Sequence, residues 1–447
     1  MIYELFSYLC TQIAKKGMAM KRTATFLFSV LVSTLLMGQT AKEEISNNLR
    51  LSASNLMAYM GPQKRLSPAP DGWQPFYISH YGSYGSCYLT SMQEYDYSLN
   101  TLRRAATAGK LTPFGENILL RLDLIRQDVE GRYGELTLLG AEQQKRIARR
   151  MYERFPEVFA GSAQIAAKST VTIRSLLSME NALQQFLLLN PHLRITHDAS
   201  QSDMYYMDQK DSLLEKAGVD MTTGEQFQVF YWRHDRPAQL MERLFNDTAY
   251  VKHEVNASLL NYSFFKVASS IQNTEQRKHL TLYDAYSDEE LYQNWLRENA
   301  RYYLGFAASP QNGGRQPFSQ RNLLRRIILE ADSCIGKGRP SASLRFGHEK
   351  ALLSLVCLLD LNGYGQQISD LEQIDRKGWR NYRIIPMSAN IQFVFYFRSI
   401  RDTDVVFKVL LNEDEATLPL KTNMAPYYRW KDFKEYYLNL LDSYSGN

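Results

Sequence analysis

Residues 76–89 constrain the fold of this chain more than any other stretch, because their pattern predicts a buried strand that leads directly into a glycine-containing loop. The apolar, aromatic run 76–78 is typical of a short buried strand. Gly82 and Gly85 follow it among small hydroxyl residues. In α/β folds such a strand end presents backbone N–H groups and a reactive side chain to a phosphate. A tyrosine-rich strand end with two turn glycines is the plainer interpretation, and a motif this short does not separate the two.

The length and charge of the chain limit what kind of protein it is. Its 447 residues suffice for roughly two or three domains, or for one core with a large insertion. The 45% hydrophobic and 22% charged residues are ordinary for a globular protein. A net charge of +5 over this length is too small to indicate nucleic acid, so we expect no nucleic-acid partner. A local basic pocket for an anionic ligand is compatible with this composition.

The first 41 residues have the pattern of an upstream extension, 1–19, followed by a signal peptide. A basic start at 20–22 precedes an apolar run at 24–37, and small and polar residues follow at 38–41. This run is shorter than the roughly 20 residues that a membrane span needs, and no later stretch is apolar enough. We therefore expect an exported protein, periplasmic or secreted, whose mature form has no stable membrane span.

Cysteine usage predicts neither a disulfide framework nor a zinc site. Cys10 falls in the leader, which leaves Cys87, Cys334 and Cys357 without close spacing. A single bridge among these three remains open. The histidines after residue 191 also lack partners at a metal-ligand spacing, so we expect no metal and no cofactor.

Alternation of strands and helices predicts an α/β core with a helical insertion. From His192 to about Asn322 the chain is strongly helical, charged and rich in Tyr and Trp, with no clear strand. Strands flank this segment on both sides, which indicates a core with an inserted cap. The predicted strands are 76–78, 163–170, 344–347, 394–397 and 405–411. The predicted parts are a leader (1–41), a first core part (42–195), a helical cap (196–322) and a second core part (323–447).

Three later motifs fall in a fixed order. Residues 134–140 read Gly-Glu-Leu-Thr-Leu-Leu-Gly and open a helix. Lys168 stands with Ser-Thr at the end of a predicted strand, before a helix with Arg174 in its first turn. His348 and its acidic neighbour Glu349 then precede an apolar helix. Together with the loop at 82–87, this order resembles the histidine acid phosphatases, and within them the phytase-like multiple inositol polyphosphate phosphatases.

The resemblance implies a fold and a reaction. The fold would be a mixed-sheet, three-layer α/β core of the histidine-phosphatase type with an inserted helical cap. The reaction would be phosphomonoester hydrolysis through a covalent phosphohistidine, with an inositol phosphate as a typical substrate. Arginines and a second histidine would clamp the phosphoryl oxygens, and an acidic neighbour would protonate the leaving alkoxide. The family needs no metal for this chemistry.

The chain departs from the family in the first motif, Arg-His-Gly-x-Arg. When the motif is aligned on Gly85, the first arginine falls on Ser83, the nucleophilic histidine on Tyr84 and the second arginine on Cys87. Moving the motif back by three residues instead puts Tyr81 at the nucleophile. Either alignment therefore has a tyrosine where the phosphohistidine should form. Only a shift that breaks the His-Gly adjacency would make the preceding histidine, at position 80, the nucleophile.

These substitutions predict impaired catalysis. A phenol has a pKa near 10 and stays protonated at neutral pH, and two clamp arginines are missing. The predicted site has a catalytic set and a phosphate-binding set: His348, Glu349 and Tyr84 in the first, and Arg174, Lys168, Ser83, Cys87 and Arg345 in the second. Two alternatives remain open. One is an active phosphomonoesterase with an atypical nucleophile (Tyr84, Cys87 or His80); the other is a non-catalytic protein that binds phosphate esters or glycans.

Overall fold

A computed structural model describes residues 39–337, 341–399 and 404–444 of the chain. Most of the predicted leader, 1–41, lies outside these ranges, so the signal peptide stays a prediction. Over the described ranges, no helix combines the length and the apolar character that crossing a bilayer requires.

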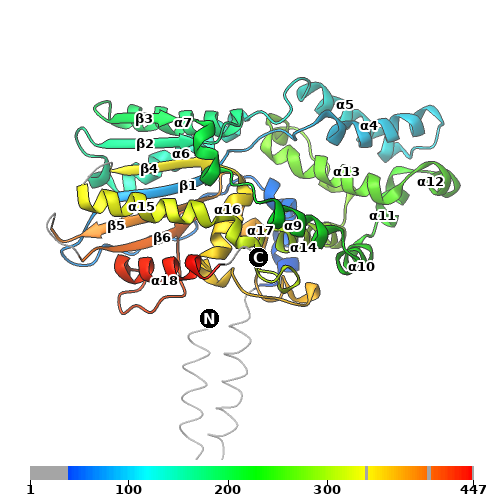
Figure 1. The fold of residues 1–447 in the computed structure, drawn as a ribbon. Coiled ribbons are helices and arrows are strands. Elements are labelled where there is room, and N and C mark those ends of the chain that lie inside the picture. Colours follow the sequence, from blue (N-terminus) through cyan, green and yellow to red (C-terminus); the bar gives the residue numbers. More distant parts are fainter. Residues whose placement is uncertain (1–38, 338–340, 400–403, 445–447) are drawn as a thin grey trace, which may run out of the picture.

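One mixed sheet forms the centre of the protein (Figure 1). Its strand order is β3-β2-β4-β1-β5-β6-β7, with β8 paired to β6. The neighbours β3, β2, β4 and β1 run parallel, whereas β5, β6, β7 and β8 add antiparallel pairs. The strands are β1 (Gln74–Ser83), β2 (Gln164–Ser169), β3 (Arg194–Asp198), β4 (Ala342–Gly347), β5 (Asn390–Phe397), β6 (Val406–Leu411), β7 (Asp414–Ala416) and β8 (Tyr428–Arg429).

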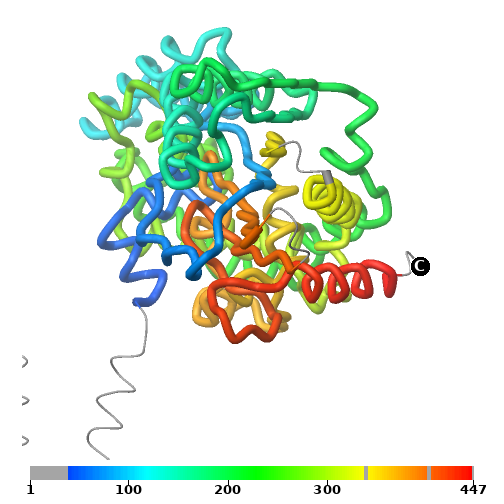
Figure 2. The backbone as a smooth tube through the Cα atoms, turned by 90° about the vertical axis from the view of Figure 1, so that its left-hand side faces the viewer, coloured from blue at the N-terminus to red at the C-terminus, as the bar shows by residue number. Residues whose placement is uncertain are grey.

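Helices cover both faces of this sheet, which gives three layers. Ile78 of β1 belongs to a buried cluster with Met151 and Phe186, from α6 and α7 on one face. Tyr77, the next side chain along the strand, belongs to the cluster of the other face. In Figure 2 the yellow α15 and the red α18 lie across the sheet from α6 and α7. These helices are α6 (Leu138–Arg154), α7 (Ile173–Leu189), α15 (Arg321–Lys337), α16 (Glu349–Leu358) and α18 (Trp430–Asp442).

A helical part stands beside the sheet, on the right in Figure 1. Most of it comes from the segment between β3 and α15, but α4 and α5 from earlier in the chain join it. Thr112, at the start of α5, donates its N–H to Leu244 O at 3.0 Å, and Lys110 pairs with Asp247 at 2.6 Å. The helices of this part are α4 (Met92–Thr107), α5 (Pro113–Asp128), α8 (Met204–Met207), α9 (Ser212–Thr223), α10 (Glu225–His234), α11 (Ala238–Leu244), α12 (Thr248–Glu254), α13 (Ala257–Ser270) and α14 (Asp288–Phe306).

Two short helices complete the fold, α3 (Ala41–Asn47) near the N-terminus and α17 (Asn381–Ile384) before β5. The five strands predicted from the sequence are β1, β2, β4, β5 and β6, and all five are confirmed. The expectation of no strand after His192 is wrong, because β3 follows at once. Its five residues form the edge of the sheet and are largely exposed, so they lack the apolar pattern that marks a buried strand.

Parallel pairing of β1 with β4 positions the loops that follow them. Ser83 lies opposite Gly347, so the next residues along the two strands, Tyr84 and His348, emerge side by side. On the other side of β4, β2 also runs parallel and ends at the same edge. Because the carboxyl ends of parallel strands meet at one edge, residues far apart in sequence converge there.

The loop after β1 is pressed against the first turn of α6. A Cβ atom on Gly140 would lie 2.2 Å from Ser86 O, and one on Gly85 would lie 2.4 Å from Gly140 O. Thr137, the N-cap of α6, also donates its hydroxyl to Ser86 O at 3.0 Å. Glycine at both positions is therefore required by close approach of two backbones.

We predict that Gly140→Ala destabilises the protein. The added methyl must push the loop away from α6, and overpacking of this kind costs about 1–3 kcal/mol. Urea unfolding measures the change. Gly336→Ala on α15 is the matched control, because nothing lies within 4 Å of its added Cβ. Equal stability of the Gly140→Ala variant and the wild type would contradict the packing described here.

Candidate active site

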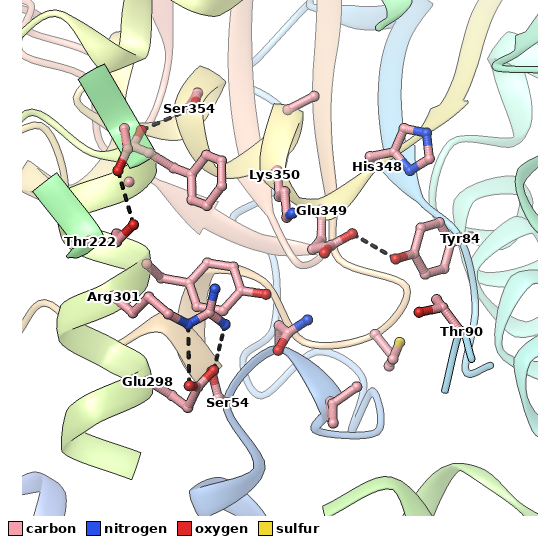
Figure 3. Close-up of a pocket in the computed structure, with 18 of the residues that line it drawn as sticks. Ser54, Tyr84, Thr90, Thr222, Glu298, Arg301, His348, Glu349, Lys350 and Ser354 are labelled. Carbon is pink, nitrogen blue, oxygen red and sulfur yellow. Dashed lines mark hydrogen bonds and ion pairs between the residues drawn. The ribbon is translucent and has the colours of Figure 1, made fainter. Parts of the chain in front are cut away.

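Three elements bring Tyr84, His348 and Arg174 together at the edge of the sheet. Tyr84 follows β1, His348 caps the start of α16 after β4, and Arg174 lies in the first turn of α7. The Tyr84 hydroxyl donates to Glu349 Oε2 at 2.8 Å (Figure 3). The Arg174 Cζ lies 4.4 Å from the centroid of the Tyr84 ring, and the His348 ring meets that ring edge-on at 5.8 Å. The phenol is therefore held between a carboxylate and a guanidinium.

These residues line a cavity of about 850 Å³ between the sheet and the helical part. This volume is within the range of small-molecule sites. The cap contributes Tyr262, Lys266, Glu298 and Arg301, while Lys350 comes from α16 directly after Glu349. Arg301 pairs with Glu298 at 2.6 Å, which Figure 3 shows below Glu349.

The surroundings of the two candidate nucleophiles in the cavity, Tyr84 and Cys87, oppose their ionisation. Burial, with Glu349 adding to it, raises the pKa of Tyr84 well above its ordinary value of 10. Burial also raises the pKa of the Cys87 thiol to about 12. Burial lowers the pKa of His348, so its imidazole is neutral at neutral pH. A protonated phenol and a protonated thiol are poor nucleophiles.

The backbone of the loop after β1 does not form a phosphate cradle. Tyr84 N–H donates to Gly347 O at 3.2 Å, Gly85 N–H to Ser178 Oγ at 3.1 Å, and Ser86 N–H to a glutamine side chain, Gln143 Oε1, at 2.9 Å. Of the two interpretations of this loop that the sequence left open, the contacts of these three N–H groups favour the plain strand end over a phosphate loop. The donors are used to fix the loop to β4, α7 and α6.

The two positions assigned to the missing arginines differ in their surroundings. Ser83 is buried and donates its hydroxyl to Ala389 O at 3.3 Å, outside the cavity lining. Cys87 lines the cavity and forms a small apolar cluster with Tyr84 and Met387. Neither of these two positions therefore supplies a cationic donor to the cavity.

Lys168 and Arg345 are corrections to the predicted phosphate-binding set, because neither lines the cavity. Lys168 Nζ pairs with Asp203 at 2.8 Å. Arg345 is buried on β4, pairs with Glu330 of α15 and donates to Ser79 Oγ at 3.0 Å. Its side chain leaves the strand toward α15, where it joins two layers of the fold.

His80, the third candidate nucleophile, is buried inside the sheet layer. Its ring packs against Phe346 at 5.3 Å and its Nδ1 has no hydrogen-bond partner among the described residues. Burial lowers the pKa of His80 from its ordinary 6.5 to about 3, and Arg345 adds to the effect. The residue lies off the cavity lining and serves packing.

Several lining residues escaped the sequence interpretation. Lys350 lines the cavity directly after Glu349, and Thr172, outside the lining, has its Oγ1 3.4 Å from His348 Nε2. Both stand next to recognised motifs and could have been found by extending those motifs. The cap residues Lys266 and Arg301 carry no local signal, since only the packing of α13 and α14 brings them to the cavity.

No metal site stands out in the part of the chain that the structure describes, where no group of three or more His, Cys, Asp or Glu side chains is suitably placed. Cys87, Cys334 and Cys357 are all free thiols and all buried.

The sequence matches the family model of the histidine phosphatase superfamily, branch 2, over residues 88–412. The chain therefore belongs to this family. The matched segment begins directly after the loop 83–87, where the first motif departs from the family pattern.

Individual relatives point to the same group. Multiple inositol polyphosphate phosphatase 1 of Gallus gallus is 22% identical over 326 residues, which are 68% of this chain and 69% of that protein. The multiple inositol polyphosphate phosphatase of Bifidobacterium longum, in complex with inositol hexasulfate, is similar in structure with a TM-score of 0.69 at 16% identity, covering 86% of this chain and 97% of that one. A phytase from D. castellii has a TM-score of 0.67 at 11% identity, covering 88% and 86%. These structural likenesses establish the shared fold.

We predict that buried His80 makes the protein less stable in acid. As pH falls below 6.5, the unfolded chain binds a proton at His80 that the folded protein, with its pKa of about 3, refuses. The contribution of neutral His80 to the free energy of unfolding is therefore fully present above pH 6.5 and is lost progressively as pH falls toward 3. One such group accounts for about 2 kcal/mol of the loss between about pH 7 and pH 5.

Urea unfolding of the wild type and His80→Leu at the two pH values measures this loss. Between about pH 7 and pH 5, the free energy of unfolding should fall by about 2 kcal/mol less in the variant than in the wild type. His279→Leu, at an exposed cap histidine, is the control and should keep the wild-type difference. An unchanged difference in His80→Leu would refute the assignment of His80 as a buried neutral residue.

Proposed function

We propose that this protein is a ligand-binding member of the inositol polyphosphate phosphatase and phytase type that no longer hydrolyses phosphate esters through a phosphohistidine. The observation that carries the proposal is the state of Tyr84. Its hydroxyl donates to Glu349, its ring lies under Arg174, and it stands where the family has its nucleophile. The phenol thereby engages the carboxylate expected to act as proton donor and the arginine expected to hold phosphate.

The physical argument rests on the chemistry that the cavity lacks. Covalent phosphoryl transfer needs an unprotonated nucleophile and preorganised cations around the phosphoryl oxygens. Tyr84 and Cys87 stay protonated, and the arginine positions hold Ser83 and Cys87. Loss of one charge-stabilising donor typically costs about 10²–10³ in rate, and the losses here include the nucleophile itself. His348 and Arg174 remain as polar groups for binding.

We predict no phosphate release by the wild-type protein from p-nitrophenyl phosphate above that of a His348→Ala control. This small ester needs only the phosphate subsite. The assay therefore measures phosphate-ester hydrolysis independently of how the rest of the cavity binds ligands. Steady release that His348→Ala abolishes would overturn the proposal. Trapped phosphate on Tyr84, Cys87 or His80 would then identify the atypical nucleophile.

Reverting the first motif tests the cause of the loss. Tyr84→His with Cys87→Arg changes two residues that line the cavity, and Ser83→Arg adds the buried third position. Restoring donors of this type should raise release by roughly 10²-fold or more over the wild type. Tyr84→Phe, which also frees Glu349 but supplies no nucleophile, is the matched control and should stay inactive.

We also propose that the protein is exported, with the chain before α3 acting as a cleaved leader. The basic start and the apolar run at 24–37 support this. Residues 1–41 fused to a reporter that folds only after export should give an active reporter, and the chain lacking them should stay in the cytoplasm of the expressing cell. Cytoplasmic retention of the fusion would contradict the proposal.

A further inference from the structure

We infer that the cavity between the sheet and the cap binds an uncharged, hydroxyl-rich ligand such as a carbohydrate, and not a polyanionic phosphate ester. The inference rests on the proposed function, since a cavity without phosphoryl-transfer chemistry need not attract phosphate. It is carried by the charges that line the cavity and by the partners that those charges already have.

Acidic side chains outnumber basic ones around the cavity. The lining includes four cationic side chains, Arg174, Lys266, Arg301 and Lys350. Against these stand six carboxylates, from Glu94, Asp208, Asp211, Glu215, Glu298 and Glu349. His348 adds no charge at neutral pH because burial lowers its pKa. A multiply phosphorylated ligand would therefore enter a field that opposes it.

Internal pairing removes half of these charges from use by a ligand. Lys266 pairs with Glu94 across the cavity wall, and Arg301 pairs with Glu298 at 2.6 Å. Asp211 is paired with an arginine of α15, Arg321, at 2.9 Å. These pairs leave the cavity with two cations that no described ion pair neutralises, from Arg174 and Lys350, and three such carboxylates, from Asp208, Glu215 and Glu349.

The two remaining cations are also turned toward aromatic rings. Arg174 lies over Tyr84, and Lys350 Nζ lies 5.3 Å from the centroid of the Phe306 ring. Cation–π interactions with these rings thus stabilise the two cations within the protein. The remaining charges give no excess of positive charge, which favours an uncharged ligand over a polyanion.

The rest of the lining suits hydroxyl groups on a partly apolar body. Uncharged polar side chains supply donors and acceptors, and rings supply flat apolar faces, the combination that fixes a small polyol in a pocket. The polar set includes Ser54, Asn55, Thr90, Thr222, Gln316 and Gln320. The aromatic set includes Tyr88, Tyr262, Phe265, Tyr302 and Phe306.

Calorimetric titration of the full mature chain tests the inference. The probes are maltotriose, cellotriose, mannotriose, N-acetylchitotriose and myo-inositol, with inositol hexakisphosphate as the polyanion. We expect saturable binding of at least one neutral probe, changing less than about twofold between roughly 50 and 300 mM salt, because screening weakens only charge–charge attraction. Inositol hexakisphosphate should bind more weakly than that probe. Absence of binding by every neutral probe, or tighter and strongly salt-dependent binding of inositol hexakisphosphate, overturns the inference.

Variants on α9 connect binding to the cavity. Glu215→Ala removes an unpaired carboxylate from the lining and should weaken the neutral probe by roughly tenfold, the value of one hydrogen bond to a charged group. Asp220→Ala, at an exposed acid of the same helix outside the lining, should leave binding unchanged. Equal effects of the two substitutions would place binding elsewhere and overturn the assignment of the site.

Charge reversal tests the field argument separately. Asp208→Lys with Glu215→Lys should create binding of inositol hexakisphosphate that falls steeply with salt, because the cavity then carries a clear excess of cations. Failure of a folded double variant, checked by its urea unfolding, to gain this binding would show that charge is not what excludes the polyanion. Phosphate release is read in a separate assay, so the proposed function and this inference can fail independently.

Discussion

The parallel pairing of β1 with β4 is the interaction on which the site depends. It sets Ser83 opposite Gly347, so that two loops separated by more than half the chain begin at the same edge of the sheet. Tyr84 and His348 become neighbours through this register alone. A shift by one residue would turn every side chain of the strand to the opposite face, which would exchange the two buried clusters around Ile78 and Tyr77. Packing on both faces of the sheet therefore also holds the geometry of the site.

The same scaffold is compatible with the proposed loss of catalysis. Ser83, Tyr84 and Cys87, the residues that the sequence alignment places in the first motif, find their partners within the fold. The phenol donates to Glu349, the thiol joins an apolar cluster with Met387, and the loop N–H groups bond to α6, α7 and β4. Buried polar groups that have partners stabilise a fold, whereas an unused phosphate subsite would leave unpaired cations buried in it.

On the cap side of the cavity, the cationic side chains also have partners within the protein. Lys266 is compensated by a carboxylate of α4 and Arg301 by one on its own helix, and the remaining cations lie over rings. A site built for a polyanion keeps its cations free, because their attraction is what the ligand uses. Here two of the four lining cations are in internal ion pairs, which is the basis for the proposed uncharged ligand.

The order of motifs along the chain was sufficient to predict the family, and local patterns were sufficient to predict the five main strands. Neither was sufficient for the short edge strand β3, which lacks such a pattern, or for the joining of α4 and α5 to the cap. The partners of each charge depend on packing between elements distant in sequence. Lys168 and Arg345 look like phosphate ligands in a linear motif, and only the tertiary structure shows them paired with Asp203 and Glu330 away from the cavity. The sequence alone therefore determined which residue types stand at the first motif. Whether a charged side chain is available to a ligand depends on the tertiary structure, because an ion pair requires two residues to be close in space and no local pattern encodes that proximity.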